Sequence, residues 1–151
     1  MRRFIVPALL VTALVLPVMI EMQAQQQRSS YYTPEERAKW RALPSADDSL
    51  FVASADIDAL LADGAVVLLD VREPDEIEEL GTREGYINIP ILELEQRLDE
   101  LDKDKAILTA CNGKSRAARA AAMLLEHGFT AINFCGLREY EGSKIYPKAQ
   151  Q

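Results

Sequence analysis

Residues 105–136 read KAILTACNGKSRAARAAAMLLEHGFTAINFCG, and this stretch decides the fold class. The apolar run Lys105–Ala110 has the composition of a buried strand, and a polar loop follows it at once. Ala117–Glu126 is an alanine-rich segment typical of a helix, closed by Gly128, and Thr130–Phe134 is a further strand. Because parallel neighbours need a crossover connection, the order strand, loop, helix, strand predicts a parallel sheet.

The same alternation precedes this stretch. Phe51–Ala53, Val66–Val71 and Tyr86–Pro90 are predicted strands, and the second is a run of valine and leucine interrupted only by Asp70, like a central strand buried on both faces. Helices are expected over three segments: about 55–63, capped by Ser54 and ended by Gly64; 75–80, opened by Pro74 and ended by Gly81; and the amphipathic segment 91–101. We therefore predict an α/β domain over residues 50–147, with a central, mostly parallel, five-stranded sheet and helices on both faces.

Residues 1–24 have the pattern of an export signal. Arg2 and Arg3 precede the uncharged run Phe4–Ile20, which is short for a membrane span. A cleaved signal peptide is therefore predicted, and with it a periplasmic or secreted protein that has no stable membrane partner beyond this segment. An uncleaved anchor in the inner membrane, facing the periplasm, is the alternative.

Residues 25–49 are predicted to be a polar leader with a short helix over about 34–42. Thr33 and Pro34 have the residue types of a helix start, and Trp40 gives the helix an apolar side chain with which to dock. A partly ordered leader in front of the domain is the alternative.

Composition excludes several function classes. The chain has 17 lysine and arginine residues against 24 aspartate and glutamate residues, for a net charge of −7, so no nucleic-acid partner is expected. Two cysteines with one histidine do not make up a four-ligand zinc site, so no metal or other cofactor is expected. Oligomeric state has no signature in this sequence.

The candidate site is the loop Cys111–Arg116, which reads CNGKSR. Cys111 follows the carboxyl end of a predicted strand, where ligands bind in open α/β sheets, and a helix begins just after it. Loop N–H groups and the helix start favour an anion, and Lys114, Arg116 and Arg119 add positive charge. The sequence thus predicts that the pKa of Cys111 is lowered and that Cys111 is a nucleophile beside a site for an anionic substrate.

Cys135 lacks such surroundings and is predicted to be a packing residue at the end of a strand. Two alternatives stay open. In one alternative, Cys111 is a small buried residue without a reactive role. In the other, it pairs with Cys135, which an adjacent strand could bring within disulfide range.

Several motifs, taken in order, resemble the rhodanese family over about residues 50–145. They are VVLLDVREPDE at 66–76, NIP at 88–90 followed by an ELEQRL-type helix, the C-x4-R loop at 111–116, and HGFTAINFCG at 127–136. With the predicted export signal, the chain is most similar to the small single-domain periplasmic members. It departs from the family pattern in Gly136-Leu137, which stands where the family has paired glycines.

The resemblance implies a sulfurtransferase with a rhodanese-like fold. Cys111 is then expected to take sulfane sulfur from thiosulfate or a similar small anionic donor as a persulfide, and to pass it to cyanide or a thiol. The active-site loop residues, whose N–H groups stabilise the persulfide, are Asn112, Gly113, Lys114, Ser115 and Arg116. Lys114 and Arg116 are expected to hold the oxyanion end of the donor.

The resemblance also assigns supporting roles to Asp70 and Arg72, which orient the loops through hydrogen bonds and ion pairing. The alternative for Arg72 is a solvated charge cluster with its acidic neighbours, and those neighbours, including Glu76, are expected to be solvated in either case. The six-residue loop from Cys111 to Arg116 is the size that the family uses for sulfur transfer, whereas related phosphatases use one residue more.

Two other functions are left open by the sequence. In the first, the chain is a non-catalytic module in the envelope that senses redox state or binds a partner. In the second, it exchanges disulfides through Cys111 and Cys135.

Overall fold

The computed structural model describes residues 19, 31–62, 64–138 and 140, and the chain divides into two units between Thr33 and Pro34. Except for Met19, the predicted signal peptide lies outside the described residues. None of the helices in the described part is long and apolar enough to cross a membrane. All helices and strands from α2 onward belong to the unit that begins at Pro34.

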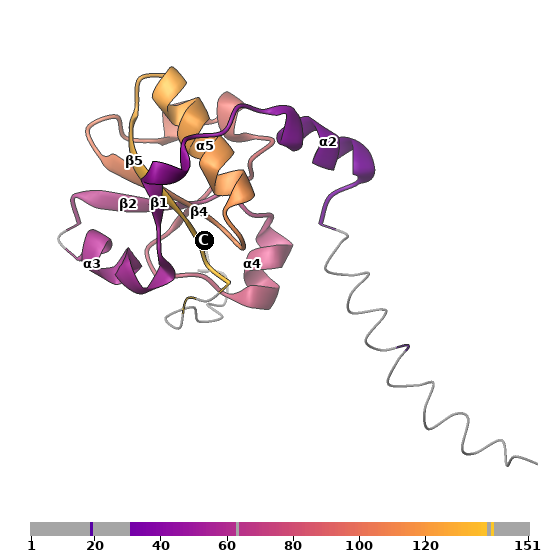
Figure 1. The fold of residues 1–151 in the computed structure, drawn as a ribbon, viewed down its shortest axis with the longest axis horizontal. Coiled ribbons are helices and arrows are strands. Elements are labelled where there is room, and N and C mark those ends of the chain that lie inside the picture. The colour runs from indigo at the N-terminus through magenta and orange to yellow at the C-terminus, as the bar shows by residue number, and fades with distance from the viewer. Residues whose placement is uncertain (1–18, 20–30, 63, 139, 141–151) are drawn as a thin grey trace, which may run out of the picture. The chain divides into compact units, whose positions relative to one another are not determined.

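Five parallel strands form one sheet in the order β1-β5-β4-β2-β3. Figure 1 labels four of them, β1, β2, β4 and β5. The strands are β1 Phe51–Val52, β2 Val66–Asp70, β3 Ile87–Asn88, β4 Ala106–Cys111 and β5 Thr130–Gly136. The predicted five-stranded sheet is confirmed, and every pairing in it is parallel. β4 occupies the centre, so the cysteine at its end lies in the middle of the carboxyl edge of the sheet.

Helices cover both faces of this sheet. α3 Ile57–Leu61 packs on one face and α5 Ser115–Glu126 on the other, and the domain also contains α2 Pro34–Ala42 and α4 Pro74–Leu80. Successive residues of a strand point to opposite faces. Leu108 and Ala110 of β4 therefore share a cluster with Leu61 of α3. Thr109, on the other face, donates its hydroxyl to the Ala117 carbonyl of α5 at 2.8 Å.

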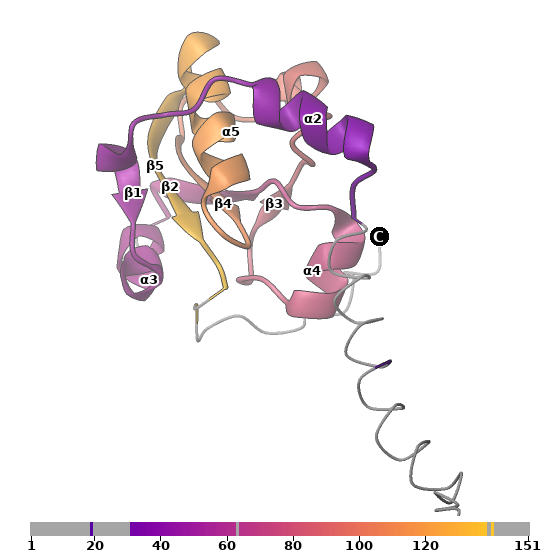
Figure 2. The ribbon, with the colours of Figure 1, turned by 45° about the vertical axis from the view of Figure 1, so that its right-hand side comes forward.

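The alanines of α5 explain how this helix packs on β4 and β5 (Figure 2). Four small residues bring the helix axis close to the strands: Ala117, Ala118, Ala120 and Ala121, all buried. On the outer side, α2 packs against α5. The N–H of Ala46 donates to the Ala118 carbonyl at 2.9 Å, and the Arg119 guanidinium lies 5.7 Å from the centre of the buried Trp40 ring.

The predicted helix over 91–101 is wrong. The segment forms two 3₁₀ turns, η3 Leu94–Gln96 and η4 Leu98–Glu100, and Arg97 between them has non-helical backbone angles of φ −123° and ψ 20°. Residues i and i+3 share a face in 3₁₀ turns and nearly share one in an α-helix. The three-residue spacing of the buried Ile91 and Leu94 fits both, so hydrophobic periodicity did not distinguish them.

The helix predicted over about 55–63 is also shorter than expected. A 3₁₀ turn, η2 Ser54–Asp56, precedes α3, and neither Ala53 nor Asp56 caps its helix with a side-chain hydrogen bond. The predicted cap at Ser54 is therefore wrong, because the chain makes a tight turn directly after β1. By contrast, α4 begins at Pro74 and ends at Gly81, whose φ of +73° favours glycine, as predicted.

Two adjacent leucines of α5 test the packing of this layer. Leu124 is fully buried, whereas the side chain of Leu125 is 47% exposed. We expect Leu124→Ala to lower the free energy of unfolding by about 2–5 kcal/mol, since it leaves a cavity against the sheet. Leu125→Ala is the matched control and should change it by less than about 0.5 kcal/mol. Urea denaturation measures both, and equal effects would contradict the assigned orientation of α5.

Candidate active site

Cys111 is the last residue of β4, and its side chain is 2% exposed. Residues 112–114 form the turn, and α5 begins at Ser115. The backbone N–H groups of Arg116 and Ala117, in the first turn of α5, hydrogen-bond to the Cys111 sulfur. The sulfur therefore lies at the N-terminus of a twelve-residue helix, as the sequence predicted.

The ionisation of Cys111 differs from the prediction. Burial raises the pKa of the thiol above its ordinary value of 9.0, and outweighs the lowering effects of the Arg116 charge and of the two N–H groups. The nearby Asp70 carboxylate raises the pKa further. The prediction of a lowered pKa is wrong for the closed loop, because sequence reasoning counted the cations and not the loss of water.

The segment after β5 supports the cysteine loop from behind. The N–H of Leu137 donates to the Cys111 carbonyl at 2.7 Å, and the N–H of Arg138 donates to the Asn112 carbonyl at 2.9 Å. A Cβ atom on Gly136 would overlap with the carbonyl oxygen of Gly113. Glycine at position 136 thus lets the two backbones approach, although the family pattern has a pair of glycines there.

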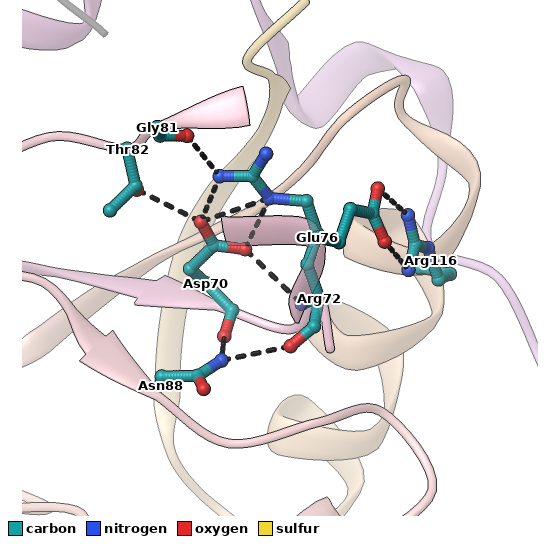
Figure 3. Close-up of polar contacts among 7 residues, drawn as sticks. All are labelled: Asp70, Arg72, Glu76, Gly81, Thr82, Asn88 and Arg116. Carbon is teal, nitrogen blue, oxygen red and sulfur yellow. Dashed lines mark hydrogen bonds and ion pairs between the residues drawn. The ribbon is translucent and has the colours of Figure 1, made fainter. Parts of the chain in front are cut away.

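Arg116 is held by a carboxylate that the sequence analysis assigned to solvent. Its two terminal nitrogens donate to the two carboxylate oxygens of Glu76 in α4, each at 2.7 Å (Figure 3). The Arg116 and Glu76 side chains are only 11% and 3% exposed. The expectation that Glu76 is solvated is therefore wrong. A usable signal was its position four residues before Leu80 and beside Ile77, on the inner side of a short helix.

Asp70 and Arg72 form a second buried ion pair, with Arg72 Nη2 at 2.6 Å from Asp70 Oδ2 (Figure 3). Arg72 also donates to the Gly81 carbonyl at 2.8 Å, and the Thr82 hydroxyl donates to Asp70 Oδ2 at 2.9 Å. Both charged side chains are buried, so a solvated charge cluster is the wrong alternative for Arg72.

Asn88 completes this network and was missed by the sequence analysis. Its side-chain amide donates to the carbonyl oxygens of Asp70 and Arg72, at 2.8 and 2.9 Å. The turn after β2 is therefore fixed by side chains from β2, from β3 and from Thr82, which follows α4. These contacts fit the supporting role that the resemblance implied for Asp70 and Arg72.

The other predicted cations do not form one positive cluster. Lys114 Nζ lies 3.2 Å from Asp48 Oδ1 and 5.4 Å from the centre of the Phe51 ring. Arg119 donates to the carbonyl and the hydroxyl of Ser115 and to the carbonyl of Arg41. Its side chain therefore joins the end of the loop at Ser115 to the chain at the end of α2.

A pocket of about 280 Å³ lies beside the loop. Its lining residues are Phe51, Ala53, Ser54, Asn112, Gly113, Lys114, Gly136 and Arg138. Arg138 was also missed by the sequence analysis, although it stands just beyond the carboxyl end of β5, where ligands bind in such sheets. The loop residues Asn112, Gly113 and Lys114 thus face a pocket, whereas Cys111 is not part of the pocket lining.

Cys135 is a buried residue of β5, as predicted. It pairs in register with Ala110, one residue before Cys111, so the two cysteine side chains leave opposite faces of the sheet. Both are free thiols, and burial raises the pKa of Cys135 to about 12. This arrangement gives no support to disulfide exchange between them.

Comparisons with known proteins identify the family of the domain. The family model of the Rhodanese-like domain matches residues 53–142. The uncharacterized protein YqhL of Bacillus subtilis is 42% identical over 82 residues, 54% of this chain and 64% of YqhL, so the match spans less than two thirds of that relative. Thiosulfate sulfurtransferase PspE of Escherichia coli is 30% identical over 80 residues, 51% of this chain and 76% of PspE.

A solved structure shows the same fold. The rhodanese-related protein from Thermoplasma volcanium superposes with a TM-score of 0.55 at 31% sequence identity, and the match covers 62% of this chain and 93% of that one. The parallel sheet with its helices is thus the fold of a known family.

The Glu76–Arg116 ion pair can be tested with its neighbour as a control. Glu76→Gln should lower the free energy of unfolding by about 3 kcal/mol, because it leaves the buried guanidinium without a counter-charge. Asp75→Asn removes the same charge from an exposed position of α4 and should cost less than about 0.5 kcal/mol. Denaturant titration compares the two variants, and an equal loss would show that Arg116 does not need Glu76.

The raised pKa of Cys111 predicts its reactivity. Because only the thiolate is alkylated, the rate should rise about tenfold per pH unit from pH 7 to pH 9. Timed iodoacetamide pulses followed by peptide mass mapping would follow Cys111 and Cys135 separately. A Cys111 rate that levels off between pH 7 and pH 8 would instead indicate a lowered pKa.

Proposed function

The chain belongs to the Rhodanese-like domain family, and from that premise we propose that it is a sulfurtransferase that works through a persulfide on Cys111. The family and its relatives with sulfurtransferase names support sulfur transfer in general. Thiosulfate, or an anion like it, is the proposed donor, in keeping with the name of PspE. Cyanide or a thiol is the proposed acceptor.

In the first step, the Cys111 thiolate attacks the outer sulfur of thiosulfate. The sulfur–sulfur bond of the donor breaks, sulfite leaves with the electron pair, and a Cys111 persulfide anion forms. In the second step, cyanide or a thiolate attacks the outer sulfur, the persulfide bond breaks, and the electron pair returns to the Cys111 thiolate. No other oxidant or reductant is needed, so the cycle is balanced.

The observation that carries this proposal is the position of the Cys111 sulfur at the backbone N–H groups of Arg116 and Ala117. Those donors stabilise negative charge on the sulfur in both steps. Glu76 binds both terminal nitrogens of Arg116 and so fixes the end of the loop where it meets α5. The Asp70–Arg72 pair fixes the adjacent turn.

Burial of Cys111 adds a requirement to the mechanism. The thiol is nearly inaccessible, so the turn at residues 112–114 has to move before a donor reaches the sulfur. Gly113 and Lys114 of this turn are exposed, so the movement would not have to displace core side chains. Opening admits water and the anion together, which also lowers the pKa of the thiol toward its ordinary value.

The same burial favours a second candidate function. A thiol that is buried and has a raised pKa also suits a non-catalytic module that senses redox state or binds a partner in the envelope. This candidate predicts no release of thiocyanate from thiosulfate and cyanide above the level of Cys111→Ser.

We also propose the cellular setting of the protein. Residues 1–24 act as a signal peptide, and the protein is periplasmic or secreted; the alternative is an anchor in the inner membrane with the domain facing the periplasm. The domain assigned to residues 50–147 carries the reaction, and its partners are the small anionic donor and the acceptor.

Intact-mass measurement tests the sulfurtransferase. Incubation with thiosulfate should add the mass of one sulfur atom to the wild-type protein, because the persulfide is covalent. Cys111→Ser should abolish the addition, and Cys135→Ser, the matched control, should keep it. An unchanged wild-type mass would refute the persulfide mechanism, and a persulfide without thiocyanate release would favour a carrier that serves a thiol.

A further inference from the structure

The pocket beside the loop has features that the persulfide steps do not use. Its lining combines two cationic side chains, Lys114 and Arg138, with the ring of Phe51, which is 43% exposed. Backbone of the cysteine loop forms the wall between them, at Asn112 and Gly113. A pocket with one apolar surface and a few charged groups has the composition of a small-molecule site.

The cationic side chains near the loop differ in the partners that they have. Arg116 is bound to Glu76, Arg119 to backbone carbonyls, and Lys114 to Asp48. Within the described part of the chain, the exposed Arg138 side chain has no such partner. In a protein with a net charge of −7, a cation placed in this way attracts an anion that comes to the loop.

The size and the apolar wall of the pocket indicate what kind of anion fits. At about 280 Å³ the pocket is larger than a five-atom inorganic anion such as thiosulfate fills. Phe51 and Ala53 offer carbon surface that such an anion does not use. An organic anion matches both parts, with its carboxylate at Arg138 and its carbon skeleton against Phe51.

We propose that this pocket binds the sulfur acceptor, a thiol that carries a carboxylate group, and that Arg138 determines this specificity. The proposal rests on the proposed function. Cys111 itself does not line the pocket, but a persulfide extends one sulfur–sulfur bond, about 2.05 Å, beyond the Cys111 sulfur. The acceptor thiolate attacks that outer sulfur, forms a new persulfide, and releases the Cys111 thiolate with the electron pair.

Transfer kinetics test the specificity. Protein loaded with thiosulfate and desalted is mixed with 3-mercaptopropionate, with 2-mercaptoethanol or with cysteamine, at equal thiolate concentrations. The wild-type rate constant should be highest for the carboxylate thiol and lowest for the cationic one. Arg138→Gln should lower the ratio of the carboxylate-thiol rate to the neutral-thiol rate about tenfold. Lys39→Gln removes one charge from the exposed side of α2 and should leave that ratio unchanged.

Binding tests the pocket without sulfur transfer. Titration of the reduced protein with 3-(methylthio)propionate, which has no thiol, should shift the backbone amide signals of Gly113 and Gly136 to saturation. Arg138→Gln should weaken this binding, whereas Lys39→Gln should not.

Different failures separate the two proposals. Absence of the persulfide with thiosulfate refutes the proposed function, and the titration then decides about the pocket. A persulfide that forms normally, but transfers to all three thiols without regard to charge, overturns the acceptor site. Slower loading by thiosulfate in Arg138→Gln, with an unchanged thiol ratio, also overturns it, because the pocket then serves the donor.

Discussion

The ion pair between Glu76 and Arg116 is the constraint on which the rest of the site depends. It joins α4, which follows the turn after β2, to the first turn of α5, which follows the cysteine loop. The Asp70–Arg72 pair fixes the turn from which α4 begins. Two buried ion pairs therefore place the N–H groups of α5 at the Cys111 sulfur, and the loss of one partner would leave a charge buried without compensation.

The end of the loop at Arg116, which is held by an ion pair, differs from the turn at residues 112–114. Asn112, Gly113 and Lys114 line an open pocket, and the carbonyl of Asn112 accepts a hydrogen bond from the N–H of Arg138, after β5. The Cys111 sulfur is buried at this loop, and the lack of water around it raises the pKa of the thiol. An ion-paired end at Arg116 and an exposed turn at Gly113 and Lys114 thus enclose a cysteine that is 2% exposed.

Much of the fold was predictable because its signals are local. Pro74 and Gly81 bound α4, and the apolar run before Cys111 forms β4, since these features act within a few residues. The segment 91–101 was not predictable in this way, because 3₁₀ turns and an α-helix place leucines three residues apart on similar faces. Glu76 was misjudged for a different reason: an acidic run does not reveal which carboxylate meets a distant arginine.

The sequence by itself determined the five strands in their order along the chain, the place of Cys111 before a helix, and the residues of its loop. Hydrophobic periodicity, proline and glycine carry that information locally. Only the tertiary structure decided that Cys111 is buried, that Arg119 donates to the Arg41 carbonyl of α2, and that Arg116 pairs with a carboxylate 40 positions away. Burial and ion pairing depend on which distant side chains the sheet brings together, and one stretch of chain does not contain that information.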